Sequence, residues 1–179
     1  MTTYSAACAL DNYDVTDASL RALLTAFYAA LETGPMTLAS DSGQIDETTI
    51  TAASVTTSQT AHYKIHYLND SLHGTAPIYV KTNWFVFNAG GYLRYAVTVG
   101  TGSDGAGNIT GIQVTMNSIL SQYSVDKPTV PVIGSGGEGY ASVFVDPGGD
   151  DQSAAYSLGI FRTTDSTDDP TDEGVFVYF

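Results

Sequence analysis

The sequence predicts a mainly β protein: an antiparallel β-sandwich of the jelly-roll kind with one N-terminal α-helix. Three observations carry this prediction. About eight or nine short segments alternate apolar and polar residues, as strands do when one face is buried. Glycine-rich turns separate them at short spacing, and a single early segment has helical spacing. Such a pattern favours a sandwich over alternating βαβ units.

The helix is expected from Val15 to Thr33. Asp14 or Thr16 is the expected N-cap, and Gly34-Pro35 ends the helix. Apolar residues recur along it at helical spacing, so this stripe packs against the rest of the protein. The stripe consists of Leu20, Leu23, Leu24, Phe27 and Leu31.

Small residues form the opposite face of this helix, because a rotation of about 100° per residue groups four alanines there. One explanation is that exposed alanines favour helix formation. The other is that a second helix approaches closely, as between subunits around a symmetry axis. We adopt the second as a prediction. The expected interface residues are Ala18, Ala22, Ala26, Ala29, Leu20, Leu24 and Phe27.

Strands are expected in most of the remaining chain. Residues 2–9 form a short one, and the threonine-rich segment 36–68 suggests two or three more. We therefore divide the chain into two regions. Residues 1–35 are an N-terminal strand and helix for attachment or oligomerisation, and residues 36–179 are a β-sandwich domain.

The clearest strands lie between Pro77 and Met116, where two glycine-rich turns join three alternating segments into a meander. Residues 118–139 are predicted to be mostly a connection, because they hold two prolines and a glycine run. Three strands close the chain. They are expected at 140–145, 156–162 and 175–179.

The chain is acidic, with 19 Asp and Glu against six Lys and Arg and a formal net charge of −13. This charge repels phosphate backbones and anionic lipid, so we expect no nucleic-acid partner and no membrane insertion. Serine and threonine supply much of the polar surface. Neutral polar faces are desolvated against a protein or a sugar at less free-energy cost than ionic faces. The single cysteine, Cys8, excludes an intramolecular disulfide.

Three motifs have simpler structural explanations than chemical ones. Residues 100–105 match G-x-G-x-x-G, but a strand follows them, which indicates a hairpin loop. His62 and His66 would lie about 13 Å apart in a strand, too far for one metal ion. The acidic loops lack the ligand spacing of a calcium loop. With no nucleophile elbow or triad either, we predict no enzyme, no cofactor and no metal site.

Tyrosines fall on strand faces that would otherwise be polar, as Tyr79 and Tyr92 do. Exposed tyrosines contact proteins and stack on sugars. Packing against the second sheet of a sandwich explains them equally well. Tyr79 and Tyr92 are therefore candidate glycan contacts.

Small virion proteins encoded by tailed bacteriophages resemble this chain in two segments, VGTGSDGAGNITG at 99–111 and GIFRTTDSTDDPTDEGVFVYF at 159–179. In those proteins a GTG-x-DGAGN-x-TG turn and a terminal RT-x-D hairpin recur, and the IYVKTNWFV strand fits the same pattern. The resemblance covers chiefly residues 76–179 and rests on turn residues. This chain departs from it in Phe161, which precedes Arg162, and in an aspartate-enriched loop.

The resemblance implies a non-enzymatic structural protein of the virion, made in the host cytoplasm. It would be a multicopy spike, head fibre or decoration subunit on capsid or tail. Its partners would be other virion proteins and copies of itself, for instance in a trimer. The alternative function is a carbohydrate-binding adhesin module that recognises host-surface glycan.

Overall fold

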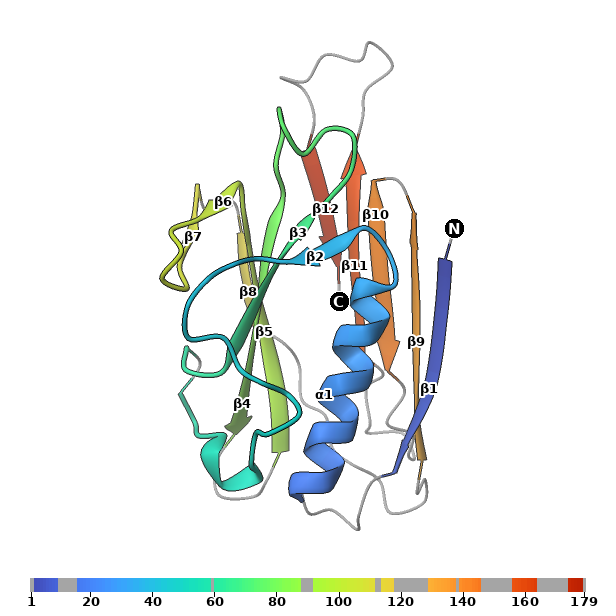
Figure 1. Cartoon of the computed structure of the whole chain (residues 1–179), viewed down its shortest axis with the longest axis vertical. Coiled ribbons are helices and arrows are strands. Elements are labelled where there is room, and N and C mark those ends of the chain that lie inside the picture. Colours follow the sequence, from blue (N-terminus) through green and yellow to red (C-terminus); the bar gives the residue numbers. More distant parts are fainter. Residues whose placement is uncertain are drawn as a thin grey trace.

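The protein is mainly β, with antiparallel sheets and one helix, as Figure 1 shows. This confirms the coarse fold class predicted from the sequence. The structure is a computed structural model. It describes residues 2–9, 16–58, 60–87, 92–111, 114–117, 129–137, 139–145, 156–163 and 174–178.

One five-stranded sheet contains the first and last described strands, and we name it the terminal sheet. Its order is β1-β9-β10-β11-β12, and all its pairs are antiparallel. Thr2 pairs with Gly136, so the sheet joins distant parts of the sequence. Its strands are β1 (Thr2–Ala9), β9 (Thr129–Gly137), β10 (Tyr140–Val145), β11 (Tyr156–Thr163) and β12 (Gly174–Tyr178).

The second five-stranded sheet, which we name the central sheet, has the order β2-β3-β4-β5-β8. The predicted meander is confirmed as β4, β5 and β8, with the hairpin β6–β7 in the connection between the last two. The elements are β2 (Met36–Leu38), the 3₁₀ turn η1 (Ala52–Ser54), β3 (Tyr63–Leu68), β4 (Tyr79–Phe87), β5 (Tyr92–Gly100), β6 (Gly102–Ser103), β7 (Ile109–Thr110) and β8 (Val114–Asn117).

Helix α1 spans Asp17–Glu32, close to the predicted range. Thr16 is its N-cap: its side chain accepts a hydrogen bond from the Ser19 backbone N–H, and the Ser19 hydroxyl lies within hydrogen-bonding distance of the Thr16 N–H. At the other end the Thr33 backbone N–H donates to the Ala29 carbonyl at 3.0 Å. The alternative cap, Asp14, lies outside the described residues.

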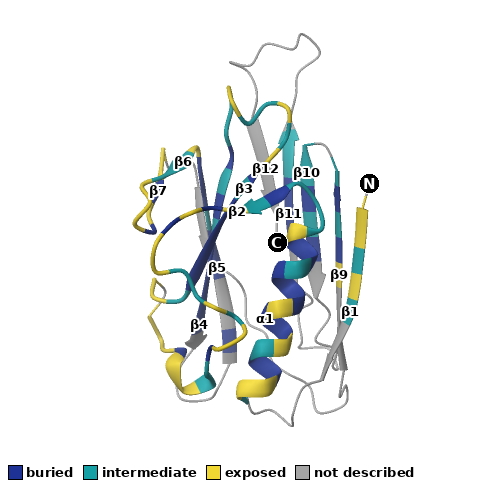
Figure 2. Ribbon diagram, viewed as in Figure 1, coloured by how far each residue is buried: buried dark blue, intermediate teal, exposed yellow. Residues whose placement is uncertain are grey.

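The helix shares one hydrophobic core with both sheets, and its apolar stripe is fully buried (Figure 2). Val80 and Trp84 of β4 and Leu158 and Ile160 of β11 belong to this core. Packing is continuous across residue 35, because β1 pairs within the terminal sheet and α1 contributes to the core of the β-rich region.

Strand β9 corrects the prediction that 118–139 is mostly a connection, because residues 129–137 pair with both β1 and β10. The glycines of this strand allow α1 to approach closely. A Cβ on Gly134 would lie 2.5 Å from the Ala30 carbonyl oxygen and 2.8 Å from the Ala30 Cα. Real Cβ atoms do not approach backbone so closely, so the glycine run is a packing surface.

Strand β3 of the central sheet is buried on both faces along most of its length. His66 and Lys64 face the core side, while Tyr63 and Ile65 face the other. A second, smaller core covers that other face of β3. The smaller core consists of Ala39, Tyr63, Ile65 and Ile109.

Candidate functional site

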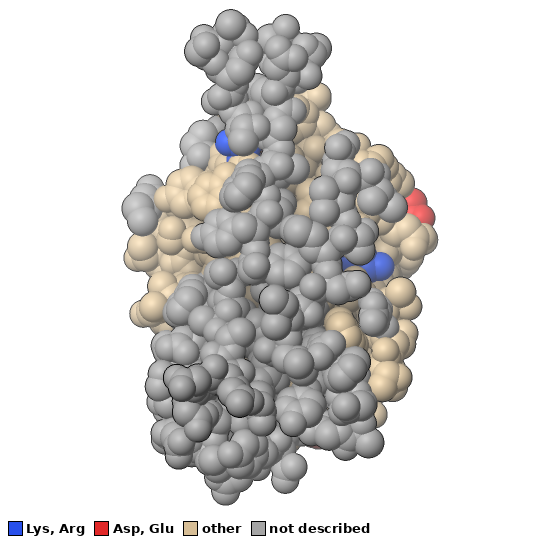
Figure 3. Space-filling view, turned by 180° about the vertical axis from the view of Figure 1, so that it is seen from behind, with Lys and Arg blue, Asp and Glu red and all other residues tan. Residues whose placement is uncertain are grey.

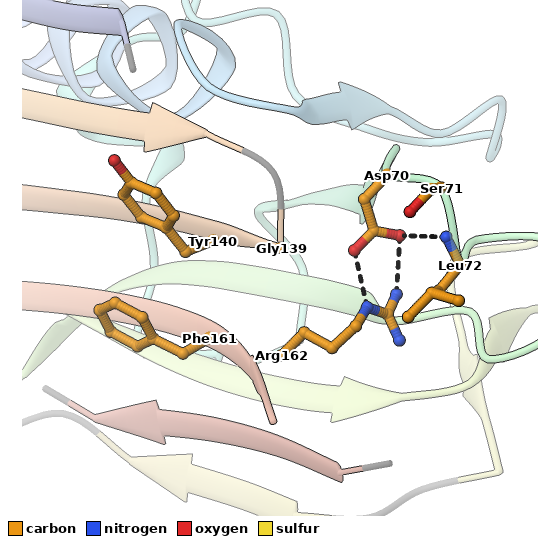
Figure 4. A pocket seen from close by; sticks show the side chains of 7 residues that line it. All are labelled: Asp70, Ser71, Leu72, Gly139, Tyr140, Phe161 and Arg162. Carbon is orange, nitrogen blue, oxygen red and sulfur yellow. Dashed lines mark hydrogen bonds and ion pairs between the residues drawn. The ribbon is translucent and has the colours of Figure 1, made fainter. Parts of the chain in front are cut away.

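A pocket of about 360 Å³ lies where the loop between β3 and β4 meets the terminal sheet (Figure 4). The loop supplies one wall, and the β9–β10 turn with the start of β10 and the end of β11 supplies the other. The pocket is lined by Asp70, Ser71, Leu72, Gly139, Tyr140, Phe161 and Arg162.

The polar wall of the pocket is a buried ion pair between Asp70 and Arg162. The Arg162 Nε–H donates to Asp70 Oδ2 at 2.7 Å, and Nη2–H donates to Oδ1 at 2.8 Å. This bidentate geometry is the strongest that arginine forms with a carboxylate. The two side chains are only 3% and 1% exposed.

The same two side chains also hold the backbone of the β3–β4 loop. Arg162 Nη1–H donates to the Ala76 carbonyl at 2.7 Å, and the Leu72 backbone N–H donates to Asp70 Oδ1 at 3.2 Å. These contacts fasten the loop of the central sheet to β11 of the terminal sheet. The charges of the pair neutralise each other, so its clear role is to position the loop.

The apolar wall of the pocket is a pair of parallel rings. Tyr140 and Phe161 are cross-strand neighbours, with ring centroids 6.0 Å apart and ring planes at 5°. Both are partly buried. Aromatic walls of this kind provide apolar area with little conformational entropy to lose on binding.

A second group of rings lies on the outer face of the central sheet, and we name it the aromatic trio: Tyr67, His73 and Tyr79. The two tyrosines are a cross-strand pair with centroids 5.6 Å apart. The His73 ring, from the β3–β4 loop, lies 4.5 Å from Tyr67 and 6.0 Å from Tyr79. All three are partly exposed. The loop that Arg162 anchors thus carries residues of both the pocket and the trio.

The trio contains one of the two tyrosines predicted as glycan contacts. Tyr79 is partly exposed on the face away from the main core. The side chain of Tyr92, at the start of β5, lies outside the described residues. His73 joins the trio from the loop, and no spacing in the sequence indicated this.

The predicted interface residues of α1 divide into buried and exposed sets. Ala18 and Ala22 are exposed and Ala29 is partly exposed, whereas Ala26 is 4% exposed. The apolar members of the predicted set lie inside the core of the chain itself. These are Leu20, Leu24 and Phe27, at most 1% exposed.

A buried hydrogen-bond network links α1 to β4. The Tyr28 hydroxyl lies 3.0 Å from Thr82 Oγ1 and accepts a hydrogen bond of 2.9 Å from Trp84 Nε1–H. Burial raises the pKa of the Tyr28 phenol far above its ordinary value, although both hydrogen bonds oppose this. Tyr28 therefore stays neutral, and its hydroxyl links the helix to the central sheet through hydrogen bonds.

Two polar side-chain pairs flank Tyr28. His66 Nε2 lies 2.9 Å from Glu32 Oε1, and the imidazole stacks on the Tyr28 ring at 5.5 Å. Lys64 pairs with Glu47, and its Nζ lies over the Tyr28 ring, 4.6 Å from the ring centroid. The hydrogen bond to His66 lowers the pKa of Glu32, against the effect of burial. The sequence showed no sign of these partners, which lie 17 and 34 positions away from Lys64 and His66.

Each basic side chain that the structure describes serves an internal contact. Arg21 donates to the Ile50 carbonyl at 2.7 Å, and Lys81 donates to the Gly107 carbonyl at 2.7 Å. Lys64 and Arg162 form the ion pairs described above. Among the described residues, these cationic side chains therefore act mainly by linking separate segments of the chain to one another.

The β6–β7 hairpin contains the glycine-rich turn from which a resemblance to virion proteins is inferred. Asp104 accepts hydrogen bonds from the Ala106 N–H at 2.8 Å, the Asn108 N–H at 3.0 Å and the Asn108 side-chain amide at 2.7 Å. These bonds lower the pKa of Asp104. Gly105 and Gly107 have φ of +75° and +92°, which glycine adopts without strain. The predicted hairpin is confirmed.

This hairpin is tied to the loop after β2. Asp41 Oδ2 accepts from the Ser103 hydroxyl at 2.7 Å, and Asp41 Oδ1 accepts from the Gly107 N–H at 3.1 Å. The Ser42 N–H donates to the Gly105 carbonyl at 3.0 Å. The motif at residues 100–105, which matches G-x-G-x-x-G by letter, is therefore part of a structural turn that covers the smaller core.

Comparison with known families, curated proteins and solved structures finds no match to this chain. The described residues contain no group of three or more His, Cys, Asp or Glu side chains arranged to hold a metal ion. No helix among them has the length and apolar character needed to span a membrane.

Proposed function

We propose that this chain is a non-enzymatic structural subunit of a bacteriophage particle, present in many copies on the capsid or the tail. The proposal rests on the resemblance to small virion proteins described above, and the observation that supports it is that residues of the resembling segments build the fold. The hairpin glycines and Asp104 shape a turn, and Arg162 anchors a loop. A resemblance confined to such residues is expected of proteins that share a scaffold.

The use of charge supports the same proposal. Arg162 and Lys64 are paired within the chain, and Lys81 bonds to a backbone carbonyl. A structural subunit needs a rigid body with neutral contact faces, and internal ion pairs and backbone ties of this kind provide rigidity. Other virion proteins and further copies of the chain are the partners that such a body would contact.

We further propose that the two sheets form a β-sandwich with α1 filling its open side. The main core contains residues of both sheets and the helix, and the Asp70–Arg162 pair links the sheets at one end. Both sheets follow mostly sequential strand order, so a sandwich of two meanders is favoured over jelly-roll crossings.

An antiserum against the purified chain tests the proposal. Particles purified by density gradient from the phage that carries the gene are immunoblotted against a dilution series of the chain. We expect a band corresponding to many copies per particle. Signal in the crude lysate but none in the purified particles would overturn the proposal.

The second candidate is glycan binding, and the aromatic trio is the observation that favours it. Three partly exposed rings meet within 6.0 Å on the outer face of the central sheet. Sugars stack their C–H faces on such rings, while ring polar atoms bond hydroxyls. His73 Nδ1 is buried without a hydrogen-bond partner among the described residues, and a small local movement would let it bind a hydroxyl.

A glycan array separates this candidate from a purely structural role. Glycan binding predicts hits for the wild type that Tyr67→Ala and Tyr79→Ala abolish. Tyr140→Ala, on the other flank of the loop, is the matched control and should keep them. An array without hits for the wild type would contradict glycan binding and leave the structural proposal standing.

A further inference from the structure

The terminal sheet is almost free of charge in a strongly acidic chain. Its five strands contain one charged residue, Arg162, which is buried against Asp70. The whole chain has 19 acidic and six basic residues. Most described atoms on the rear of the molecule also belong to uncharged residues (Figure 3).

The two faces of this sheet can be told apart from its packing. Gly134, Ala141, Val143, Leu158 and Ile160 point toward the helix and the core. The alternate residues therefore point outward. Those whose side chains are described are Thr3, Ser5, Ile133, Ser135, Tyr140, Ser142 and Phe161.

This outer face combines hydroxyl groups with one prominent apolar side chain. Thr3 and Ser5 are exposed, and Ser142 is partly exposed. Ile133 is 48% exposed, one of two large hydrophobic residues so exposed in the described part of the chain. It lies next to Ser5 in the register between β1 and β9.

We propose that the outer face of the terminal sheet is the surface through which two copies of this chain associate. A contact about a two-fold axis sets a patch against itself, so the patch must be self-complementary. Hydroxyls satisfy this condition because each both donates and accepts hydrogen bonds. Ile133 supplies apolar area to such a contact.

Net charge restricts where two copies can meet. Each carries a formal charge of −13, so approach through acidic segments is opposed by like-charge repulsion. The terminal sheet carries no charge on its described outward side chains, and contact there desolvates no carboxylate of these residues. Helix α1 is a poorer surface, because only Ala18 and Ala22 of its seven predicted interface residues are exposed.

The size of the face fits a weak dimer. Five strands spaced about 4.8 Å apart, with roughly seven residues each at about 3.4 Å, cover roughly 550 Å² per copy. Two copies would bury roughly 1,100 Å², at the lower limit of specific interfaces. We therefore expect association at about micromolar concentrations or higher.

Light scattering coupled to size-exclusion chromatography measures this association. At about 100 µM the wild type should approach twice its 18.9 kDa monomer mass, and added salt should strengthen association by screening the repulsion. The double variant Ser5→Glu, Ile133→Glu should weaken association at least about tenfold. Ala53→Glu, Thr57→Glu adds the same charge at exposed positions elsewhere and should dimerise like the wild type.

Circular dichroism confirms that each variant folds. A monomeric wild type at about 100 µM in high salt would overturn the proposal, as would a Ser5→Glu, Ile133→Glu protein that folds and still dimerises. Neither result depends on whether the chain is found in particles, because the inference does not rest on the proposed function.

Discussion

The two large sheets contact α1 by different means. The terminal sheet meets the helix through small residues: Gly134 lies against Ala30 so closely that a methyl group does not fit. The central sheet meets it through side-chain hydrogen bonds, with Tyr28 between Thr82 and Trp84. One contact depends on shape and the other on polar pairing.

This difference shows how one helix serves two sheets. Polar pairing tolerates small shifts, because ion pairs and hydrogen bonds adjust at the ends of long side chains. Backbone contact tolerates none, because neither main chain can move aside. Substitutions in the two regions should therefore fail in different ways, and the following predictions test this from the largest effect to the smallest.

Arg162→Leu should have the largest effect, because it removes the link between the sheets and leaves Asp70 buried without its partner. Loss of one partner of a buried pair costs about 3–5 kcal/mol. Thermal unfolding should occur roughly 10 °C or more below the wild-type Tm. The double variant Asp70→Leu, Arg162→Leu should recover much of this loss. A single variant as stable as the wild type would show that the pair does not fasten the loop.

Gly134→Ala tests the backbone contact. The added methyl group would overlap the Ala30 backbone, and overpacking of this kind costs about 1–3 kcal/mol. Gly74→Ala is the matched control, because nothing lies within 4 Å of its Cβ position. Chemical denaturation of the two proteins should separate them clearly. Equal stabilities would argue against close packing of α1 on β9.

Tyr28→Phe tests the polar contact. It removes one hydroxyl and leaves the buried Trp84 Nε1–H and the Thr82 hydroxyl without this partner, which costs about 1–3 kcal/mol. Tyr67→Phe changes a partly exposed ring in the same way and should alter the free energy of unfolding by under about 0.5 kcal/mol. If both variants lose the same stability, the network between α1 and β4 is energetically unimportant.

Glu32→Gln should have the smallest effect, because Glu32 is 41% exposed and solvent screens its charge. The folded-state pKa of Glu32 lies below its ordinary value of 4.5, chiefly because of the bond to His66. Its charge therefore stabilises the fold fully above about pH 4.5, and this contribution is lost as pH falls through the folded pKa. The Tm difference between wild type and variant should shrink below pH 4.5; a constant difference would contradict this assignment.

The sequence predicted well what depends on local pattern. The alternation of β4 and β5, the glycine turn at 100–111 and the helix ends follow from neighbouring residues, and each lies close to its expected place. The final strands were also placed within a residue or two. The spacing of apolar residues and the residue types of a turn are local properties, so they can be recognised in a single sequence.

What the sequence could not predict depends on long-range contact. The glycine run in β9 was taken for a connection because the helix that needs those glycines lies about a hundred positions earlier. Arg162 gave no sign of its partner Asp70, 92 positions away. The aromatic trio likewise needs a loop residue to fold back over a strand pair. In each case the sequence showed the residue types but not their neighbours.

The pairing of β1 with β9 has a consequence for synthesis on the ribosome. Thr2 and Gly136 lie 134 positions apart, so β1 stays without its partner until the residues of β9 have been synthesised. The leucines of α1 likewise belong to a core that includes residues of β10 and β11, which are synthesised later still. Contacts of such separation slow folding, and the nascent chain must stay soluble meanwhile. We expect a chaperone to bind an uncharged edge strand that stays unpaired for that long.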